Sequence, residues 1–262
     1  MDDQLPDSDY FRTYRNSLGF TNQQNAKAFL SGKDVPASID YKYIDRLLAR
    51  LNEILTAINH SMHESRRHEN IEQFITTHVQ AIYETVRETG NLPRLNNQGR
   101  RPEQVLYSWL RGYAITRFLQ PAIADLFQLE HSAVHDFGDD DFRTIETFRR
   151  TPKADLRLQH NSQNVVIEVQ SGFQGINDIK QHKVLEAKRI YREEGIVTLC
   201  MHFDVFNGQV AFIRLDTIDE ENLSWITRQQ MEGQTVFNID QGYFGWRIMN
   251  PLPPLDSLDL NL

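Results

Sequence analysis

Hydrophobic positions divide the chain into a helical first part and a mixed second part. Between residues 39 and 88 they recur at the spacing of amphipathic helices, in two separate runs. Ser38 is a suitable N-cap for the first run, and "TGNLP" ends the second. The first run contains Ile44, Leu47, Leu48, Leu51, Ile54, Leu55 and Ile58. We expect an antiparallel helix pair whose apolar faces either pack within the chain or form a dimer interface.

A third helix is predicted over residues 103–127, after the polar loop "LNNQGRRPEQ". Pro102 suits the first turn of this helix, because a first-turn residue needs no intrahelical N–H bond. The segment is largely apolar, so we expect it to be buried. Gly112 and Pro121 are positions where it could bend or split.

Beyond the acidic turn "DFGDDD" the pattern changes to strands with one long helix between them. Strands are expected at 142–150, 154–159, 165–170, 196–206, 209–216, 235–239 and 243–249, and helices at 176–195 and 220–230. Helices followed by this alternation predict an α/β fold. Its core is a mixed β-sheet flanked by helices, behind a helical N-terminal region.

The 262 residues fit one large domain, or one domain with an accessory subdomain. We divide the chain into a helical region at 1–93 that could serve dimerisation and DNA contact, a core at 94–250, and a loosely attached, Pro-rich acidic tail at 251–262.

The hydrophobic runs, the first ten residues and the cysteine count indicate the cellular compartment of the protein. No apolar run reaches the length of a membrane span, and the acidic start "MDDQLPDSDY" does not resemble a signal peptide. Cys200 is the single cysteine, so no disulfide can form within the chain. These features predict a cytoplasmic protein without a membrane partner, with Cys200 as a packed thiol.

The charge distribution permits a local phosphate-binding surface. The net charge is −8, which argues against a generally basic nucleic-acid binder. Residues 94–203 nevertheless carry +1, between ends of −3 and −6. Binding of DNA needs a positive groove rather than a positive average.

The chemistry centres on the hairpin "PKADLRLQHNSQNVVIEVQ". Glu168 and Gln170 share one face of an apolar strand, because side chains alternate along a strand. A tight turn near residues 160–164 brings Asp155 opposite Glu168, or one residue away. Two carboxylates with the carbonyl of Val169 form an oxygen set suited to Mg²⁺. Such an ion polarises a phosphoryl oxygen and activates water.

This stretch resembles the active site of the PD-(D/E)xK nuclease superfamily, and within it the type II restriction endonucleases. Their signature is Pro-Asp on one strand, a hairpin, and Glu-x-Lys on the next strand before a helix. Here Pro152 and Asp155 are separated in "PKAD", and Gln170 replaces the final lysine. Some restriction endonucleases with six-base palindromic targets carry this Glu-x-Gln variant, including a near-identical "VEVQ" strand.

The resemblance implies a restriction-endonuclease-like core and assigns roles to the residues. Asp155 and Glu168 would hold the metal, Gln170 would orient the attacking water, and Ser171 would add a polar neighbour. Gln170 has no charge, so either the metal alone carries the role of the usual lysine or a lysine from the next helix reaches the site. The candidates are Lys180, which we favour as closer in sequence, and Lys183, which could also contact DNA.

A third acid and a set of DNA contacts are also implied. The superfamily often adds an acid from a helix before the core, and Glu103 has a suitable position; complementing the helix dipole is its alternative role. The donors suited to base edges lie on the loop before the third helix, which could otherwise be a solvated loop: Arg94, Asn97, Gln98, Arg100 and Arg101. Lys183, from the later helix, could contact the DNA backbone.

These expectations amount to a Mg²⁺-dependent type II restriction endonuclease, with Mn²⁺ as a substitute ion and no organic cofactor. Its partner would be double-stranded DNA, and the resemblance implies a homodimer, since each active site cuts one strand of a palindrome. The alternatives are a repair, recombination or competence nuclease on the same core, and an inactive DNA-binding protein.

Overall fold

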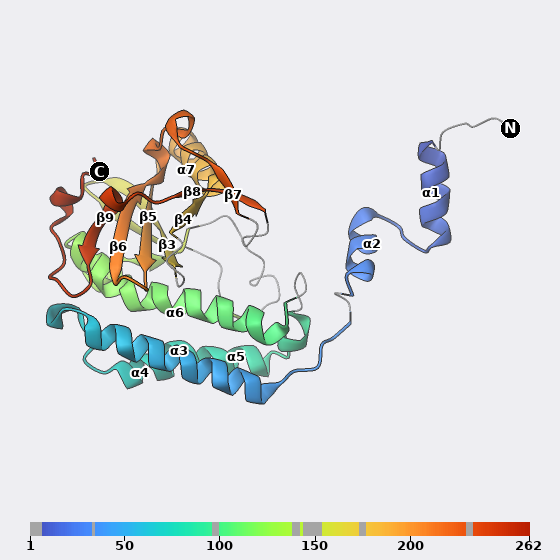
Figure 1. The fold of residues 1–262 in the computed structure, drawn as a ribbon, viewed down its shortest axis with the longest axis horizontal. Coiled ribbons are helices and arrows are strands. Elements are labelled where there is room, and N and C mark those ends of the chain that lie inside the picture. Colours follow the sequence, from blue (N-terminus) through green and yellow to red (C-terminus); the bar gives the residue numbers. More distant parts are fainter. Residues whose placement is uncertain are drawn as a thin grey trace.

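A six-stranded sheet forms the centre of the computed structural model, which describes residues 7–32, 35–95, 100–137, 142–143, 154–172, 177–228 and 233–262 (Figure 1). Its strand order is β1-β2-β3-β5-β6-β9. The pair β3–β5 is parallel and the other pairs are antiparallel. The strands are β1 (His135–Asp136), β2 (Leu156–His160), β3 (Gln163–Gly172), β5 (Val197–Asp204), β6 (Gln209–Arg214) and β9 (Phe244–Arg247). The sheet is therefore mixed, as predicted; the expected strand at 142–150 falls almost entirely outside the described residues.

The hairpin between β2 and β3 turns at Asn161 and Ser162. Both residues have positive φ, 47° and 67°, which is the backbone conformation of the two-residue turns that match strand twist. His160 pairs with Gln163, and the register continues to Leu156 opposite Ile167. This short turn fixes which side chains of the two strands lie side by side.

The parallel pair β3–β5 requires a crossover, and α7 (Gln181–Glu194) supplies it. The helix ends at Gly195, whose φ of 67° is a left-handed C-cap. Before α7 the chain forms β4 (Asp178–Lys180), which joins a second sheet of order β4-β8-β7. Its other strands are β8 (Gln234–Asn238) and β7 (Ile226–Arg228).

The helix predicted at 220–230 is wrong for most of its length. Only Glu220–Asn222 form a 3₁₀ turn, and Ile226–Arg228 pair with β8. Strand pairing with a segment further along the chain outweighs the local helical spacing here.

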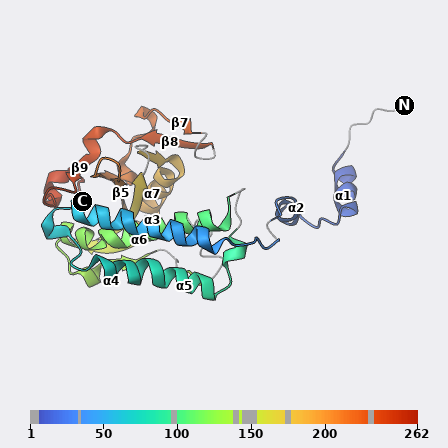
Figure 2. The same ribbon diagram turned by 60° about the horizontal axis from the view of Figure 1, so that its bottom comes forward.

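The helices α3, α4, α5 and α6 form a layer on the face of the central sheet that lies away from α7 (Figures 1 and 2). The helix α6 (Pro102–Leu126) packs on β3 and runs unbroken through Gly112 and Pro121. On its outer side lies α3 (Tyr41–Ser61), which begins after the N-cap Asp40. A composite helix follows: α4 (Ile71–Ile75), a π-helical turn (Thr76–Gln80) and α5 (Ala81–Glu88).

Two hydrophobic clusters hold these layers together. The larger lies between the sheet and the helical layer and takes alternate residues of β5, such as Leu199 and Met201. The smaller lies under α7 and the second sheet, and takes Cys200 from the other face. The apolar faces of α3 and α5 belong to the larger cluster. Their pairing therefore serves packing within the chain.

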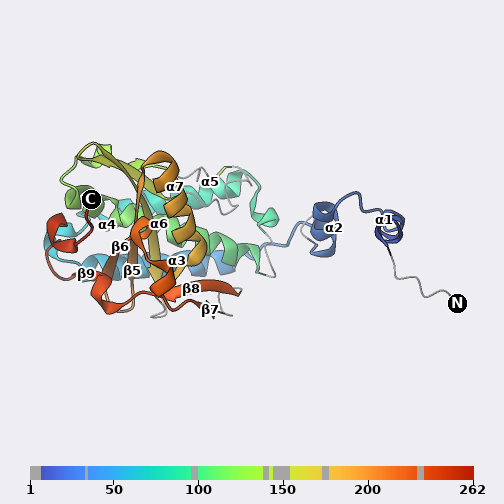
Figure 3. The ribbon, with the colours of Figure 1, turned by 90° about the horizontal axis from the view of Figure 1, so that it is seen from above.

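The two ends of the chain differ in how they contact this body. The C-terminal segment packs on it, with Leu260 buried and Leu255 and Leu258 against the larger cluster, although the sequence suggests a loose tail. At the other end, α1 (Ser8–Ser17) and α2 (Gln23–Leu30) extend away from the body in all three views (Figures 1–3). Within the described part of the chain, no helix combines the length and apolar character that a membrane span requires.

Candidate active site

The hairpin brings Asp155 and Glu168 together where β2 ends. The last register pair of the hairpin is Leu156 opposite Ile167, so Asp155 lies just beyond the end of β2, within one residue of the predicted position opposite Glu168. The backbone N–H of Asp155 donates to the Ile167 carbonyl (3.0 Å), and its Oδ2 accepts the Val169 N–H (2.7 Å). The Asp155 side chain thus satisfies the Val169 N–H that lies just past the last β2–β3 pair. This bond fixes the Asp155 carboxylate at β3.

Glu168 is nearly buried and is held by two donors. Its side chain is 11% exposed and forms an ion pair with Lys183, whose Nζ lies 2.9 Å from Oε2. The amide of Gln170 donates weakly to Oε1 at 3.4 Å. Glu168 and Gln170 face the layer of α7, whereas Val169 belongs to the larger cluster on the other face. Strand alternation places Ser171 on that other face as well.

The lysine that contacts Glu168 is Lys183, although the sequence favoured Lys180. The helix α7 begins at Gln181, so Lys183 lies in its first turn. It is four residues before Ala187, which is buried against the sheet, and residues at this spacing share a helix face. Lys180, which the sequence favoured, is the last residue of β4, where its register partner is Val236. The rotation of α7 brings Lys183 to Glu168.

The Cys200 thiol lies close enough to Asp155, Glu168 and Lys183 to be affected by their charges. Cys200 is the register partner of Glu168 on β5 and is fully buried. Burial raises the pKa of its thiol, the negative charges of Glu168 and Asp155 raise it further, and Lys183 lowers it. The pair of acids and the lysine therefore act on one buried point of the sheet. The thiol itself stays protonated, which fits its prediction as a packed residue.

A second polar group continues along β5 and was not anticipated from the sequence. His202 is the register partner of Gln170, and its Nε2 lies 2.9 Å from Oδ1 of Asn177. The Asn177 amide donates to Asp204 (3.0 Å), so its oxygen must accept and the His202 Nε2 must carry the proton. Thr198, Cys200, His202 and Asp204 alternate along the strand, and this alternation is the signal in the sequence.

The charge states in this second group follow from burial. Burial lowers the pKa of His202 to about 4, against the opposing effect of Asp204 and Asp178. Burial raises the pKa of Asp204, but hydrogen bonds from Asn207 and Asn177 outweigh it and leave the pKa below its usual value. The ring is therefore neutral beside an ionised carboxylate. The His202 Nδ1 is buried and finds no partner among the described residues.

The donors at Asp155 and Glu168 fit a hard divalent cation. Two carboxylates lie on adjacent segments, and the carbonyl of Val169 points to the same edge as its N–H, which Asp155 accepts. Among the described residues no group of three or more His, Cys, Asp or Glu side chains could hold a metal. A site of two carboxylates suits Mg²⁺, which retains several waters and binds substrate phosphates.

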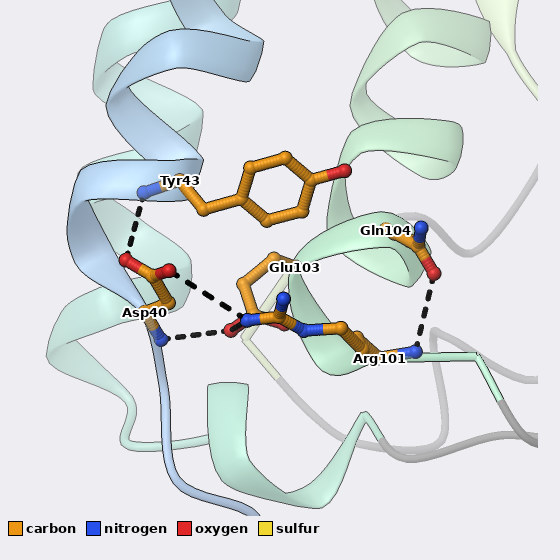
Figure 4. Close-up of polar contacts among 5 residues, drawn as sticks. All are labelled: Asp40, Tyr43, Arg101, Glu103 and Gln104. Carbon is orange, nitrogen blue, oxygen red and sulfur yellow. Dashed lines mark hydrogen bonds and ion pairs between the residues drawn. The ribbon is translucent and has the colours of Figure 1, made fainter.

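Glu103 lies in a different cluster, at the start of α6 (Figure 4). Its Oε1 accepts the Asp40 N–H (2.7 Å) and contacts Arg101 (3.1 Å). Burial opposes ionisation of Glu103, but these donors and its own backbone N–H hold its pKa below the usual value. Its Oε2 is buried without a partner in the described chain. These contacts join the start of α3 to the start of α6.

The other predicted DNA contacts lie around the same end of α6. Arg94 and Arg100 are exposed, whereas Arg101 packs over the Tyr43 ring and pairs with Glu103. Asn97 and Gln98 lie outside the described residues.

Comparison with known proteins gives distant similarity to solved structures. No family model matches the chain, and no curated protein matches it. The solved structure of Hjc, a Holliday junction resolvase from Archaeoglobus fulgidus, matches 49% of this chain and 85% of its own. The identity is 14% and the TM-score 0.31. At this level of similarity neither the fold family nor the function of the resolvase transfers to this chain.

Proposed function

We propose that this protein is a Mg²⁺-dependent endonuclease that hydrolyses phosphodiester bonds of double-stranded DNA. One observation carries the proposal: Glu168 forms an ion pair with Lys183, and Asp155 accepts the N–H of the adjacent Val169, at the point where the β2–β3 ladder ends. Two carboxylates can hold a divalent cation, and a lysine can stabilise negative charge on a phosphate.

Each residue has a distinct role in this proposal. Asp155, Glu168 and the Val169 carbonyl would hold the cation, which when bound polarises the scissile phosphoryl group and activates water. Gln170 would orient the attacking water through its amide. Lys183 would provide the positive charge that stabilises the developing charge on phosphate.

Lys183 also bears on whether the site is active. The Glu-x-Gln strand itself contributes no positive charge beside the two acids. The ion pair with Lys183 restores that charge from α7. This contact favours an active nuclease over a DNA-binding protein that has lost catalysis.

Type II restriction activity is the form of cleavage that we propose. It rests on the resemblance of "IEVQ" to strands of restriction endonucleases with palindromic targets. Cutting both strands of a palindrome needs two copies of the site, so the active form would be a homodimer. Arg94 and Arg100 are exposed and would contact the DNA backbone, which contributes affinity rather than sequence choice.

Digestion of a plasmid of known sequence tests the proposal. We expect discrete fragments with Mg²⁺ or Mn²⁺ and none with EDTA, and sequencing of the fragment ends would give the target and the cut position. Cleavage confined to branched or single-stranded DNA would indicate a repair, recombination or competence nuclease. A gel shift without cleavage under every metal condition would indicate a binding protein.

A further inference from the structure

One face of the strand β2 is open to solvent. Leu156 and Leu158 point into the larger cluster. Arg157 and Gln159 alternate with them along the strand, so they lie on the opposite face, where both are exposed. The strand therefore has one side in the core and one side in water.

The open face of β2 adjoins the candidate active site. Arg157 is paired with Val166, which lies two residues before Glu168 on β3. Side chains two apart on a strand share a face, so Arg157 and Glu168 project to the same side of the sheet. They are diagonal neighbours, at about 7–8 Å, a distance that a long side chain can span. An exposed arginine is therefore within reach of a phosphate group bound at Glu168.

The helix α7 borders this face and packs mainly elsewhere. It contacts β5, β8 and the 3₁₀ turn Leu215–Thr217. Its C-terminal end meets the start of β3, where the Gln163 amide donates to the Gly195 carbonyl (2.6 Å). The side chains of Arg157 and Asn164 remain exposed. The open face thus lies between α7 and the strand β1, toward one edge of the central sheet.

Arg157 carries a positive charge that no described residue neutralises. Within the described ranges, no ion pair or hydrogen bond holds its guanidinium. Its register partner on β1 is His135, while Asp136 belongs to the other face and pairs with Arg117 of α6. Three cations of α7, in contrast, are already paired with acids: Lys183, Lys188 and Arg189. The charge of Arg157 is therefore available to an external anion.

A DNA strand is the partner that fits this charge. The candidate site holds two carboxylates, which repel a phosphate backbone. A free arginine beside them offsets part of that repulsion and offers parallel N–H donors to phosphate oxygens. The exposed amides of Gln159 and its register partner Asn164 are further donors along the same face.

We propose that the open face of β2 is a contact surface for the DNA backbone, and that Arg157 binds a phosphate beside the scissile one. This inference rests on the proposed nuclease function and names the surface that the DNA crosses. Such a contact holds the strand on the two acids and adds affinity, and it carries no information on base sequence.

Binding of duplex DNA in EDTA tests the role of Arg157. The probe is a pool of labelled duplex fragments that covers the plasmid, so the target need not be known. We expect Arg157→Gln to weaken binding about tenfold at low salt. It should also reduce the slope of log affinity against log salt by about one, because one phosphate contact is lost. Arg157→Lys keeps the charge and should retain most of the affinity.

The matched control is Arg247→Gln, since Arg247 is an exposed arginine on β9, the opposite edge strand of the same sheet. It should leave both the affinity and the salt slope unchanged. Both arginines lie outside the two hydrophobic clusters. Circular dichroism should therefore show the same thermal transition for all these variants.

Photo-crosslinking locates the DNA independently of affinity. Cys200 is the single cysteine and is fully buried, so Gln159→Cys gives the protein one accessible thiol. A phenyl azide attached to this thiol should crosslink the fragments on illumination. The same reagent on Gln241→Cys, an exposed position just before β9, should not.

Two results would overturn the inference and leave the nuclease proposal standing, provided that the wild type cleaves plasmid. One is wild-type affinity and salt slope for Arg157→Gln, or a loss of affinity without a change in slope. The other is crosslinking from Gln159→Cys that does not exceed that from Gln241→Cys. A wild-type chain that neither binds nor cleaves the DNA would instead remove the proposed function, and this inference with it.

Discussion

The Nζ of Lys183 lies 2.9 Å from Oε2 of Glu168, and both side chains are largely buried. The strand that carries Glu168 has Gln170 where the Glu-x-Lys signature has its lysine. The positive charge therefore comes from the first turn of α7 and reaches the same acid from the layer above the sheet. In the proposed mechanism this arrangement would separate two functions, because Gln170 would orient water while Lys183 would carry the charge.

Replacing either acid should abolish cleavage without abolishing DNA binding. We expect Asp155→Asn and Glu168→Gln to reduce plasmid cleavage by at least about 10³-fold, because each variant removes a charged ligand of the cation. The bound cation stabilises the charge of the transition state by several kcal/mol. A gel shift in Ca²⁺ or EDTA measures binding separately. Glu53→Gln, which affects an exposed ion pair with Arg50 on α3, is the control. Normal cleavage by Glu168→Gln would show that the active site lies elsewhere.

Lys183→Met should reduce both cleavage and stability. Loss of the ammonium should lower the rate of cleavage by about 10²-fold or more. It also leaves Glu168 buried without its partner, which costs about 3–5 kcal/mol where the acid stays ionised. Plasmid cleavage and urea unfolding measure the two effects.

The control for Lys183 is Lys188→Met, on the same helix. It breaks a more exposed ion pair between Lys188 and Glu220. It should leave cleavage intact. The double variant Glu168→Gln/Lys183→Met should recover most of the lost stability but none of the activity, because no unpaired charge remains. If Lys180→Met lost cleavage and Lys183→Met retained it, the lysine at the end of β4 would be the functional one.

His202 should make stability depend on pH in mildly acidic solution. Burial keeps the ring neutral in the folded protein, with a pKa of about 4, whereas the unfolded chain binds a proton below about 6.5. This contribution is therefore complete above about pH 6.5 and is lost as the pH falls toward 4. It amounts to about 3 kcal/mol at most. Urea unfolding of wild type and His202→Gln should give curves that converge between pH 6.5 and 4.5, and parallel curves would contradict the assignment.

Glu103→Gln distinguishes a structural acid from a third metal ligand. The amide can still accept the Asp40 N–H but no longer pairs with Arg101, so we expect a loss of about 1–2 kcal/mol in unfolding free energy. Cleavage and its dependence on Mg²⁺ concentration should not change. A variant that keeps its stability but needs far more Mg²⁺ would instead place Glu103 at the metal.

The mixed sheet and the position of its acids could be predicted because they depend on local pattern. Alternation defines β3, and the number of residues in the turn fixes the register up to Leu156 opposite Ile167, which leaves Asp155 directly after the last pair. Which lysine reaches Glu168 could not be predicted in the same way. The start of α7 depends on β4, and β4 forms only because β8 pairs with it from far along the chain. That long-range pairing sets the rotation of α7.

Two other features were missed for related reasons. Ile226–Arg228 have local helical spacing, but they extend as β7 because β8 offers hydrogen bonds. The polar residues His202 and Asp204 sit in an apolar run that reads as an ordinary buried strand. They are tolerated inside because Asn177, from a distant segment, supplies their hydrogen bonds.

The Val169 amide donates a hydrogen bond to Asp155, so the carboxylate proposed to hold the cation also satisfies a backbone N–H of β3. A cation bound to the Asp155 carboxylate would weaken the hydrogen bond that the carboxylate accepts from the Val169 N–H. The Val169 N–H resonance should therefore shift when Mg²⁺ is added, even in a protein with no DNA to cut. The chemical shift of this amide would therefore report how much of the metal site is occupied, independently of the rate of DNA cleavage.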